Sequence, residues 1–129
     1  MRVMNDGEVM TLGKTAITAH ATPGHTMGSM SWSWQACEGK RCKVIVFASS
    51  LNPVSADDYR FSGPAGAPFV AGFAQSYRTM AALSCDILIS AHPDNAGEGR
   101  YRADPGACRA YADLSRKALA KRLAAEKTK

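Results

Sequence analysis

The chain has 129 residues, of which 46% are hydrophobic and 21% charged, and its formal net charge is +5. These values predict one globular domain over residues 1–129 and exclude a membrane span, since no apolar run approaches the roughly 20 residues required. The first residues are too polar for a signal peptide. Much of the excess positive charge lies near one end, where no aromatic residues alternate with it, so it indicates a solvated basic face and not a nucleic-acid surface.

The first half of the chain is predicted to form strands. Residues 8–12 and 15–21 alternate in polarity around a two-residue turn, which is typical of a hairpin. Residues 43–48 are continuously apolar, as expected of a strand covered on both faces. Because residues 1–7 lead directly into a strand, we expect that a preceding segment has been lost.

The segment 29–35 alternates large apolar with small polar side chains. This period predicts a half-buried strand. We expect its large side chains to face the core and its serines to face outward: Met30, Trp32 and Trp34 against Ser29, Ser31 and Ser33.

The second half is predicted to mix helices with one strand. Residues 49–68 form a long loop of the kind that often serves a site. Apolar residues at helical spacing predict a helix over 69–83, and residues 86–91 form another buried strand. A second helix over 107–127 follows Asp104-Pro105 after a loop, and we expect its inward residues to be Tyr111, Leu114, Ala118 and Leu123. The expected fold is α/β (α+β), a sheet with helices on one side.

The four cysteines suggest two disulfides. Cys37 and Cys42 flank a predicted hairpin turn, and a bridge across such a turn is geometrically easy. Cys85 precedes a strand and Cys108 begins the terminal helix, so their bridge would join helix to sheet. Such pairs indicate an oxidising compartment, and the alternative is four buried thiols in a cytosolic protein.

Two histidines carry the strongest chemical signal. His25 lies in the turn 22–26, where Pro23 and Gly24 present it after a strand, and His92 follows a later strand. Imidazoles at loop tips suit a divalent metal such as zinc. The alternative is a pair of unrelated surface histidines. His20, inside a strand, is expected to be structural or exposed.

Two further polar segments have weaker signals. Ser49, Ser50 and Asn52 follow the buried strand 43–48, and without a Gly-x-Ser-x-Gly motif we expect a supporting role there and no nucleophile. Serines at a strand end often satisfy only backbone groups. The acidic and basic residues of 57–60 are interpreted as a solvated loop.

Ordered matches along nearly the whole chain resemble the C-terminal half of a zinc β-lactamase of the metallo-β-lactamase superfamily. The resemblance is to the subclass with Ser in place of a Cys ligand. The matching stretches are 6–13, 22–26 with Gly28, 31–34, 47–51, 55–62, 85–93 and 108–112. The resemblance implies half of an αββα sandwich, in which two sheets pack between helices.

The resemblance also implies roles for individual residues. His25 would be a ligand of the first zinc and His92 a ligand of the second. Ser50 would take the Cys-replacing position, and Asn52 would help to hold the substrate carboxylate. The pair Cys85–Cys108 matches the subclass disulfide. The implied reaction is opening of a β-lactam amide by a zinc-bound hydroxide, in a periplasmic or secreted protein with two zinc ions per complete site.

Two departures from the subclass limit this expectation. Ser49 stands where Asp is common, and the His-x-His-x-Asp-His motif that supplies most zinc ligands is not present among the three histidines. Apart from a metal-bound water, the chain therefore offers no catalytic group of its own. We expect one of three arrangements: the chain is a fragment of a longer enzyme, it pairs with a separate N-terminal half, or it self-associates through the exposed face of the sheet. The alternative hypothesis is a truncated, non-catalytic half-domain that folds by association and binds little or no metal.

Overall fold

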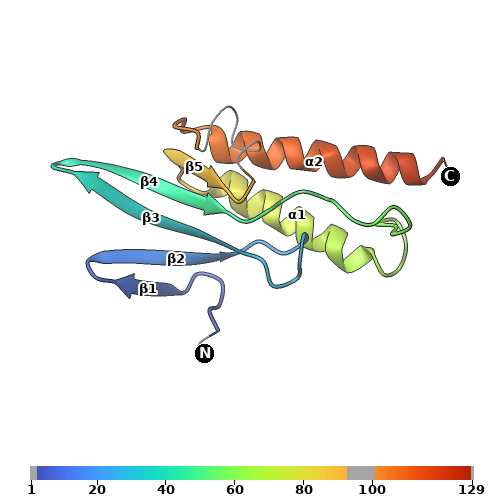
Figure 1. Cartoon of the computed structure of the whole chain (residues 1–129), viewed down its shortest axis with the longest axis horizontal. Helices are drawn as coiled ribbons and strands as arrows, with labels where there is room; N and C mark the ends of the chain where they lie inside the picture. The colour runs from blue at the N-terminus through green and yellow to red at the C-terminus, as the bar shows by residue number, and fades with distance from the viewer. Residues whose placement is uncertain (1–2, 93–100, 129) are drawn as a thin grey trace.

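The computed structural model describes residues 3–92 and 101–128, so Pro93 and the first part of the predicted loop after it lie outside the described residues. Every predicted strand and helix is present (Figure 1). In chain order these are β1 (Val9–Leu12), β2 (Thr15–Ala21), β3 (Met30–Glu38), β4 (Arg41–Ala48), α1 (Ala67–Ala82), β5 (Ile87–Ser90) and α2 (Ala107–Glu126).

The strands form one mixed sheet in the order β1-β2-β3-β4-β5. The first four pair antiparallel with their neighbours in sequence, whereas β5 pairs parallel with β4 after the crossover through α1. This topology makes β2, β4 and β5 run in the same direction. The loops that follow these three strands therefore leave the sheet at the same edge, and they carry His25, Ser50 with Asn52, and His92 respectively.

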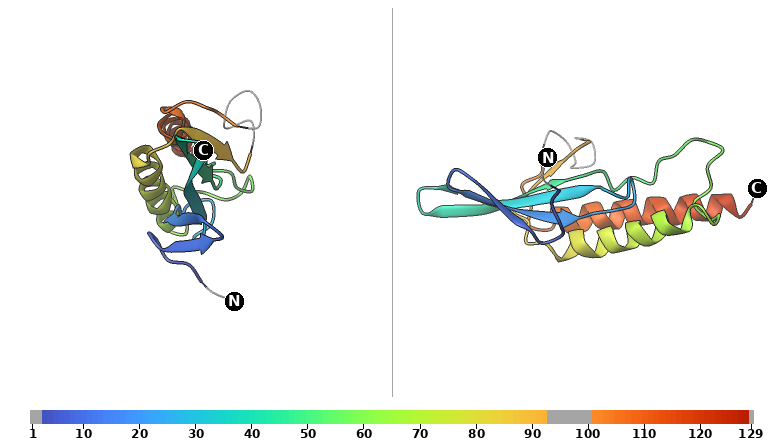
Figure 2. Two further views of the ribbon diagram at one scale, coloured as in Figure 1. Left: turned by 90° about the vertical axis from the view of Figure 1, so that its left-hand side faces the viewer. Right: turned by 90° about the horizontal axis from the view of Figure 1, so that it is seen from below.

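The two helices lie side by side on one face of the sheet (Figure 2). Their buried residues, such as Phe73, Met80 and Tyr111, form one core with Val46 and Leu88 of the sheet. The expected arrangement, a mixed sheet with helices on one side, is confirmed. Burial of this apolar surface is the main source of stability for these elements.

The opposite face of the sheet is apolar and open. It forms a groove of about 430 Å³ between β1 and β4, lined by Met10, Leu12, Thr15, Ile17, Trp32, Trp34 and Phe47. The prediction that the β3 serines face outward is therefore wrong: Ser31 is fully buried on the helix side, while Trp32 and Trp34 are only half-buried. The alternation was predicted correctly, but a two-layer structure has its core on one face only, and the tryptophans occupy the other.

The inward face of α2 also differs from expectation. Tyr111 is buried and Leu123 half-buried as predicted, but Leu114 is 57% exposed and Ala118 is exposed as well. The buried positions Tyr111, Ser115 and Leu119 recur every four residues. A small polar residue therefore occupies the buried face, where the Ser115 carbonyl accepts a hydrogen bond from the Tyr77 hydroxyl of α1 (3.2 Å). Apolar spacing alone does not indicate such a position.

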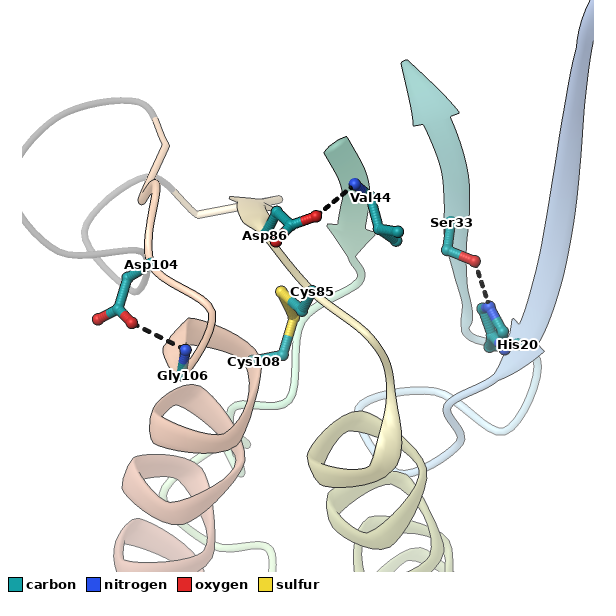
Figure 3. The surroundings of a disulfide bond; sticks show 8 residues. All are labelled: His20, Ser33, Val44, Cys85, Asp86, Asp104, Gly106 and Cys108. Atoms are coloured by element: carbon teal, nitrogen blue, oxygen red, sulfur yellow. Dashed lines mark hydrogen bonds between the residues drawn. A yellow bond between two sulfur atoms is a disulfide. The ribbon is translucent and has the colours of Figure 1, made fainter. Parts of the chain in front are cut away.

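Both predicted disulfides are present. Cys37–Cys42 joins opposite positions of the β3–β4 hairpin, and Cys85–Cys108 ties the segment before β5 to the first turn of α2 (Figure 3). Beside the second bridge, an Asp86 carboxylate oxygen accepts a hydrogen bond from the backbone N–H of Val44 (2.8 Å), which fixes β5 against β4. In the part of the chain that is described, neither helix carries an apolar stretch long enough to cross a bilayer.

The carboxylate of Glu126 helps to fasten the long loop to the end of α2. Glu126 accepts hydrogen bonds from the backbone N–H groups of Phe61 (3.1 Å) and Ser62 (2.7 Å), and Arg122 pairs with it one helical turn away (3.1 Å). Burial favours a raised pKa, but these donors outweigh it and lower the pKa of Glu126 from 4.5 to about 2. The ionised form is therefore the one that the fold stabilises.

The pH dependence of unfolding tests this clamp. Because the pKa of Glu126 is lower in the folded chain than in the unfolded one, its contribution is complete above pH 4.5 and is lost as pH falls toward about 2. We expect Glu126→Gln to lower the melting temperature at neutral pH and to converge with the wild type near pH 2. Asp58→Asn, at an exposed carboxylate of the same loop, is the control. Parallel curves for wild type and Glu126→Gln would contradict this role.

Candidate functional site

The turn after β2 is shaped by close packing against α1. Gly24 has φ of +135°, a region that favours glycine, and a Cβ at this position would lie 2.5 Å from a ring carbon of Phe73. The Ser76 hydroxyl on α1 also donates a hydrogen bond to the Pro23 carbonyl. The sequence-based interpretation of Gly24 is confirmed, and these contacts fix the backbone from which His25 projects.

His25 is exposed, and its imidazole ring contacts the loop that follows β4. Its Nδ1 lies 3.0 Å from the main-chain carbonyl oxygen of Asn52. A carbonyl oxygen can only accept a hydrogen bond, so Nδ1 carries the proton. In the neutral ring this leaves Nε2 as the nitrogen with a free lone pair, which is the arrangement found in metal-binding histidines whose other nitrogen is held by a carbonyl.

The loop after β4 contains the other predicted supporting residues. Ser50 is buried, and its hydroxyl accepts a hydrogen bond from the backbone N–H of Asn52 (3.3 Å). Asn52 is half-buried and contacts His25 through its carbonyl, so Ser50 and His25 meet the same residue from two sides. The structure thus brings three of the predicted site residues together.

His92 follows β5 at the same edge of the sheet. It is exposed, and its backbone N–H donates to the Ser90 hydroxyl (3.2 Å). The backbone N–H of Ala91 donates to the Ala48 carbonyl (3.0 Å), which places the end of β5 directly beside the end of β4. His92 therefore lies at the end of the strand adjacent to the one that leads to Ser50.

Beneath these loops lies a buried hydroxyl network that the sequence did not reveal. Ser31 on β3 accepts a hydrogen bond from the backbone N–H of Ser49 (3.0 Å), and its hydroxyl pairs with that of Thr22 (2.9 Å). Both hydroxyl-bearing residues are fully buried. The sequence feature that could have indicated this network is a serine on β3 placed beside the end of the apolar strand β4. The network was missed because the serines of β3 were expected to face solvent.

Two other polar segments were also singled out in the sequence. His20 is half-buried and bonds the Ser33 hydroxyl (2.7 Å), and burial lowers its pKa although the nearby Asp6 opposes the shift. It is structural, one of the two expected outcomes (Figure 3). Asp57, Asp58 and Arg60 are exposed, as expected of a solvated loop.

The residues present fit only part of a zinc site. A catalytic zinc takes about three protein ligands. In residues 3–92 and 101–128, no group of three or more His, Cys, Asp or Glu side chains could hold a metal ion, and all four cysteines are in disulfides. His25 and His92 offer imidazoles from one edge of the sheet, and further ligands must come from elsewhere for a site to be complete.

A scan against protein-family models finds no match. Solved structures do match. A B3 metallo-β-lactamase described as the first with an active-site glutamic acid is 73% identical, with a TM-score of 0.95 over 98% of this chain and 47% of that one. The chain resembles the C-terminal half of a subclass B3 metallo-β-lactamase.

Other metallo-β-lactamases match in the same way. MEM-A1, a subclass B3 enzyme from a soil metagenome library, is 44% identical with a TM-score of 0.91, covering 98% of this chain and 53% of its own. SMB-1, solved with 2-mercaptoethanesulfonate, is 46% identical with a TM-score of 0.87, covering 97% and 52%. The chain therefore spans about half the length of the metallo-β-lactamases it matches, and the resemblance expected from the sequence is confirmed.

These neighbours support the metallo-β-lactamase superfamily and a hydrolase reading for the chain. Zinc is implied for the superfamily in general. The two disulfides together with the subclass B3 neighbours are consistent with an extracytoplasmic protein.

Proposed function

We propose that this chain supplies one half of the active site of a zinc-dependent β-lactam hydrolase in the periplasm or outside the cell. His25 would bind the first zinc and His92 the second. Ser50 and Asn52 would support the second zinc and the substrate carboxylate. The remaining zinc ligands would come from an N-terminal half, which together with residues 1–129 would make up one complete domain.

The observation that carries this proposal is the shared edge of the sheet. Three loops, after β2, β4 and β5, leave the sheet together because the three strands run in the same direction. The Asn52 carbonyl holds Nδ1 of His25, so the free lone pair of the neutral ring is on Nε2. An exposed imidazole with one nitrogen fixed in this way is prepared to bind a metal.

The open face of the sheet supports the proposal that an N-terminal half packs against this chain. Its groove is lined by two tryptophans and several aliphatic residues, whereas the other face is already covered by α1 and α2. Apolar surface of this kind marks an interaction site. A complementary half that covered this face would bury the tryptophans and bring its own ligands to the edge at His25.

One observation favours the second candidate, a non-catalytic half-domain. Residues 3–92 and 101–128 contain no complete group of metal ligands, so this part of the chain would offer at most a weak site. In that case the chain would fold by self-association through the open face and bind little or no metal. The two candidates make opposite predictions for zinc content after complementation.

Complementation tests the proposal directly. The chain is purified alone and after co-expression with the N-terminal half of the 73%-identical metallo-β-lactamase. We expect the complex to hold about two zinc ions and to hydrolyse a chromogenic cephalosporin, while the chain alone is inactive. His25→Ala or His92→Ala should each remove about one zinc and lower turnover at least about 10³-fold, because the metal supplies several kcal/mol of transition-state stabilisation.

His20→Gln is the matched control, because this third histidine bonds Ser33 away from the proposed ligands. It should leave zinc content and turnover close to those of the parent complex. A complex that forms but stays free of zinc and inactive would instead support the non-catalytic half-domain. Unchanged zinc content in His25→Ala or His92→Ala would exclude that residue as a ligand.

A further inference from the structure

The loops after β2 and β4 are joined at two levels. At the surface, Nδ1 of His25 donates to the Asn52 carbonyl (3.0 Å). In the interior, the Ser31 hydroxyl joins Thr22 at the end of β2 (2.9 Å) to Ser49 at the end of β4 (3.0 Å). Thr22 precedes His25 by three residues, and Ser49 precedes Asn52 by three residues. The two loops thus start from one anchored point and meet again at the imidazole.

The link between the Ser31 and Thr22 hydroxyls lies in the interior. Both residues have 0% relative exposure, so bulk water does not reach this hydrogen bond. The Ser31 oxygen accepts from the Ser49 N–H while its hydroxyl is paired with Thr22, so one side chain holds both strand ends at once. Removal of this oxygen would leave the Ser49 N–H and the Thr22 hydroxyl without this partner. The backbone pairing of β3 with β2 and β4 would remain, but the side-chain link that sets the spacing of the two loops would be lost.

We propose that Ser31 is a positioning residue for His25. By fixing the distance between the ends of β2 and β4, its hydroxyl keeps the Asn52 carbonyl within hydrogen-bond distance of Nδ1. The proton then stays on Nδ1, and Nε2 is the unprotonated nitrogen of the neutral ring. The metal-binding consequence rests on the proposed function of His25, whereas the link between Ser31 and the His25 tautomer does not.

The His25 tautomer can be read directly by NMR. Long-range proton–nitrogen spectra of the ¹⁵N-labelled chain report which ring nitrogen of each of the three histidines is protonated. We expect His25 of the wild type to be in the Nδ1–H form. In Ser31→Ala the ratio of Nδ1–H to Nε2–H should fall about five-fold, the effect of losing one hydrogen bond. Ser31→Thr keeps the hydroxyl and should restore the wild-type signal.

Ser33→Ala is the matched control. Ser33 lies on the same strand and the same face as Ser31, but its hydroxyl bonds His20. This variant should move the His20 signals and leave those of His25 unchanged. If Ser31→Ala fails to fold, Thr22→Val removes the other hydroxyl of the link in a residue of similar shape and should shift the His25 ratio in the same direction.

Two results would overturn the inference: a wild-type His25 signal in folded Ser31→Ala, or equal His25 shifts in Ser31→Ala and Ser33→Ala. Zinc binding is measured in a separate experiment. In the complemented protein, Ser31→Ala should weaken zinc binding about 10-fold if His25 is a ligand. A tautomer shift in a protein that binds no zinc would uphold the positioning role and reject the proposed function.

Discussion

Gly24→Ala should lower the free energy of unfolding by about 3–5 kcal/mol, since backbone strain and overpacking act at the same atom. The new methyl group would lie 2.5 and 2.6 Å from two ring carbons of Phe73 and 2.9 Å from its backbone nitrogen. The φ of +135° adds strain for any residue with a side chain. Chemical denaturation of the chain measures the loss directly.

Gly28→Ala is the control for this substitution. Gly28 lies in the same loop, but nothing is within 4 Å of a Cβ at that position. We expect its stability to stay within about 0.5 kcal/mol of the wild type, as for ordinary surface changes. Similar losses in the two variants would mean that α1 does not pack against the turn as described.

The second large effect concerns the open face of the sheet. Replacing Trp32 and Trp34 by lysine should weaken binding of the complementary N-terminal half about 10³-fold, because buried tryptophans at an interface contribute about 2 kcal/mol or more each. Both line the groove and are only half-buried in the chain by itself. Calorimetric titration of one half with the other gives the affinity.

Leu114→Lys controls for added charge and lost apolar area. Leu114 is 57% exposed on α2, in the layer opposite the groove. Its replacement should leave the affinity between halves unchanged. Equal affinity for the wild type and the double tryptophan variant, with secondary structure intact, would show that another surface joins the halves.

The elements and disulfides of this fold were predictable because their signals are local. The turn around Gly24 combined a proline, a glycine and a histidine directly after an alternating strand, and the structure confirms its form. Cys37 and Cys42 flanked a hairpin, which places them opposite each other in the ladder. Such features depend on a few neighbouring residues, so the sequence alone indicates them.

The wrong predictions concern which face of β3 and of α2 packs against the core. Alternation in β3 was correct, but the choice of inner face assumed that the largest side chains are buried, and Ser31 is buried in place of Trp32. On α2, Ser115 occupies a buried position and Leu114 does not, for the same reason. Neither result follows from periodicity, because both depend on the packing partner of each face. The hydroxyl network at Ser31 was not predicted for the same reason, because Ser31 was placed on the solvent face.

The order of the strands has a consequence for how this chain folds. Each of the first four strands hydrogen-bonds to the next one in the sequence, so short loops are closed first and only β5 must return through a helix. Low sequence separation between partners favours rapid folding. The sheet can therefore assemble before any companion arrives, and during that interval its indole-rich surface is exposed to other newly made chains.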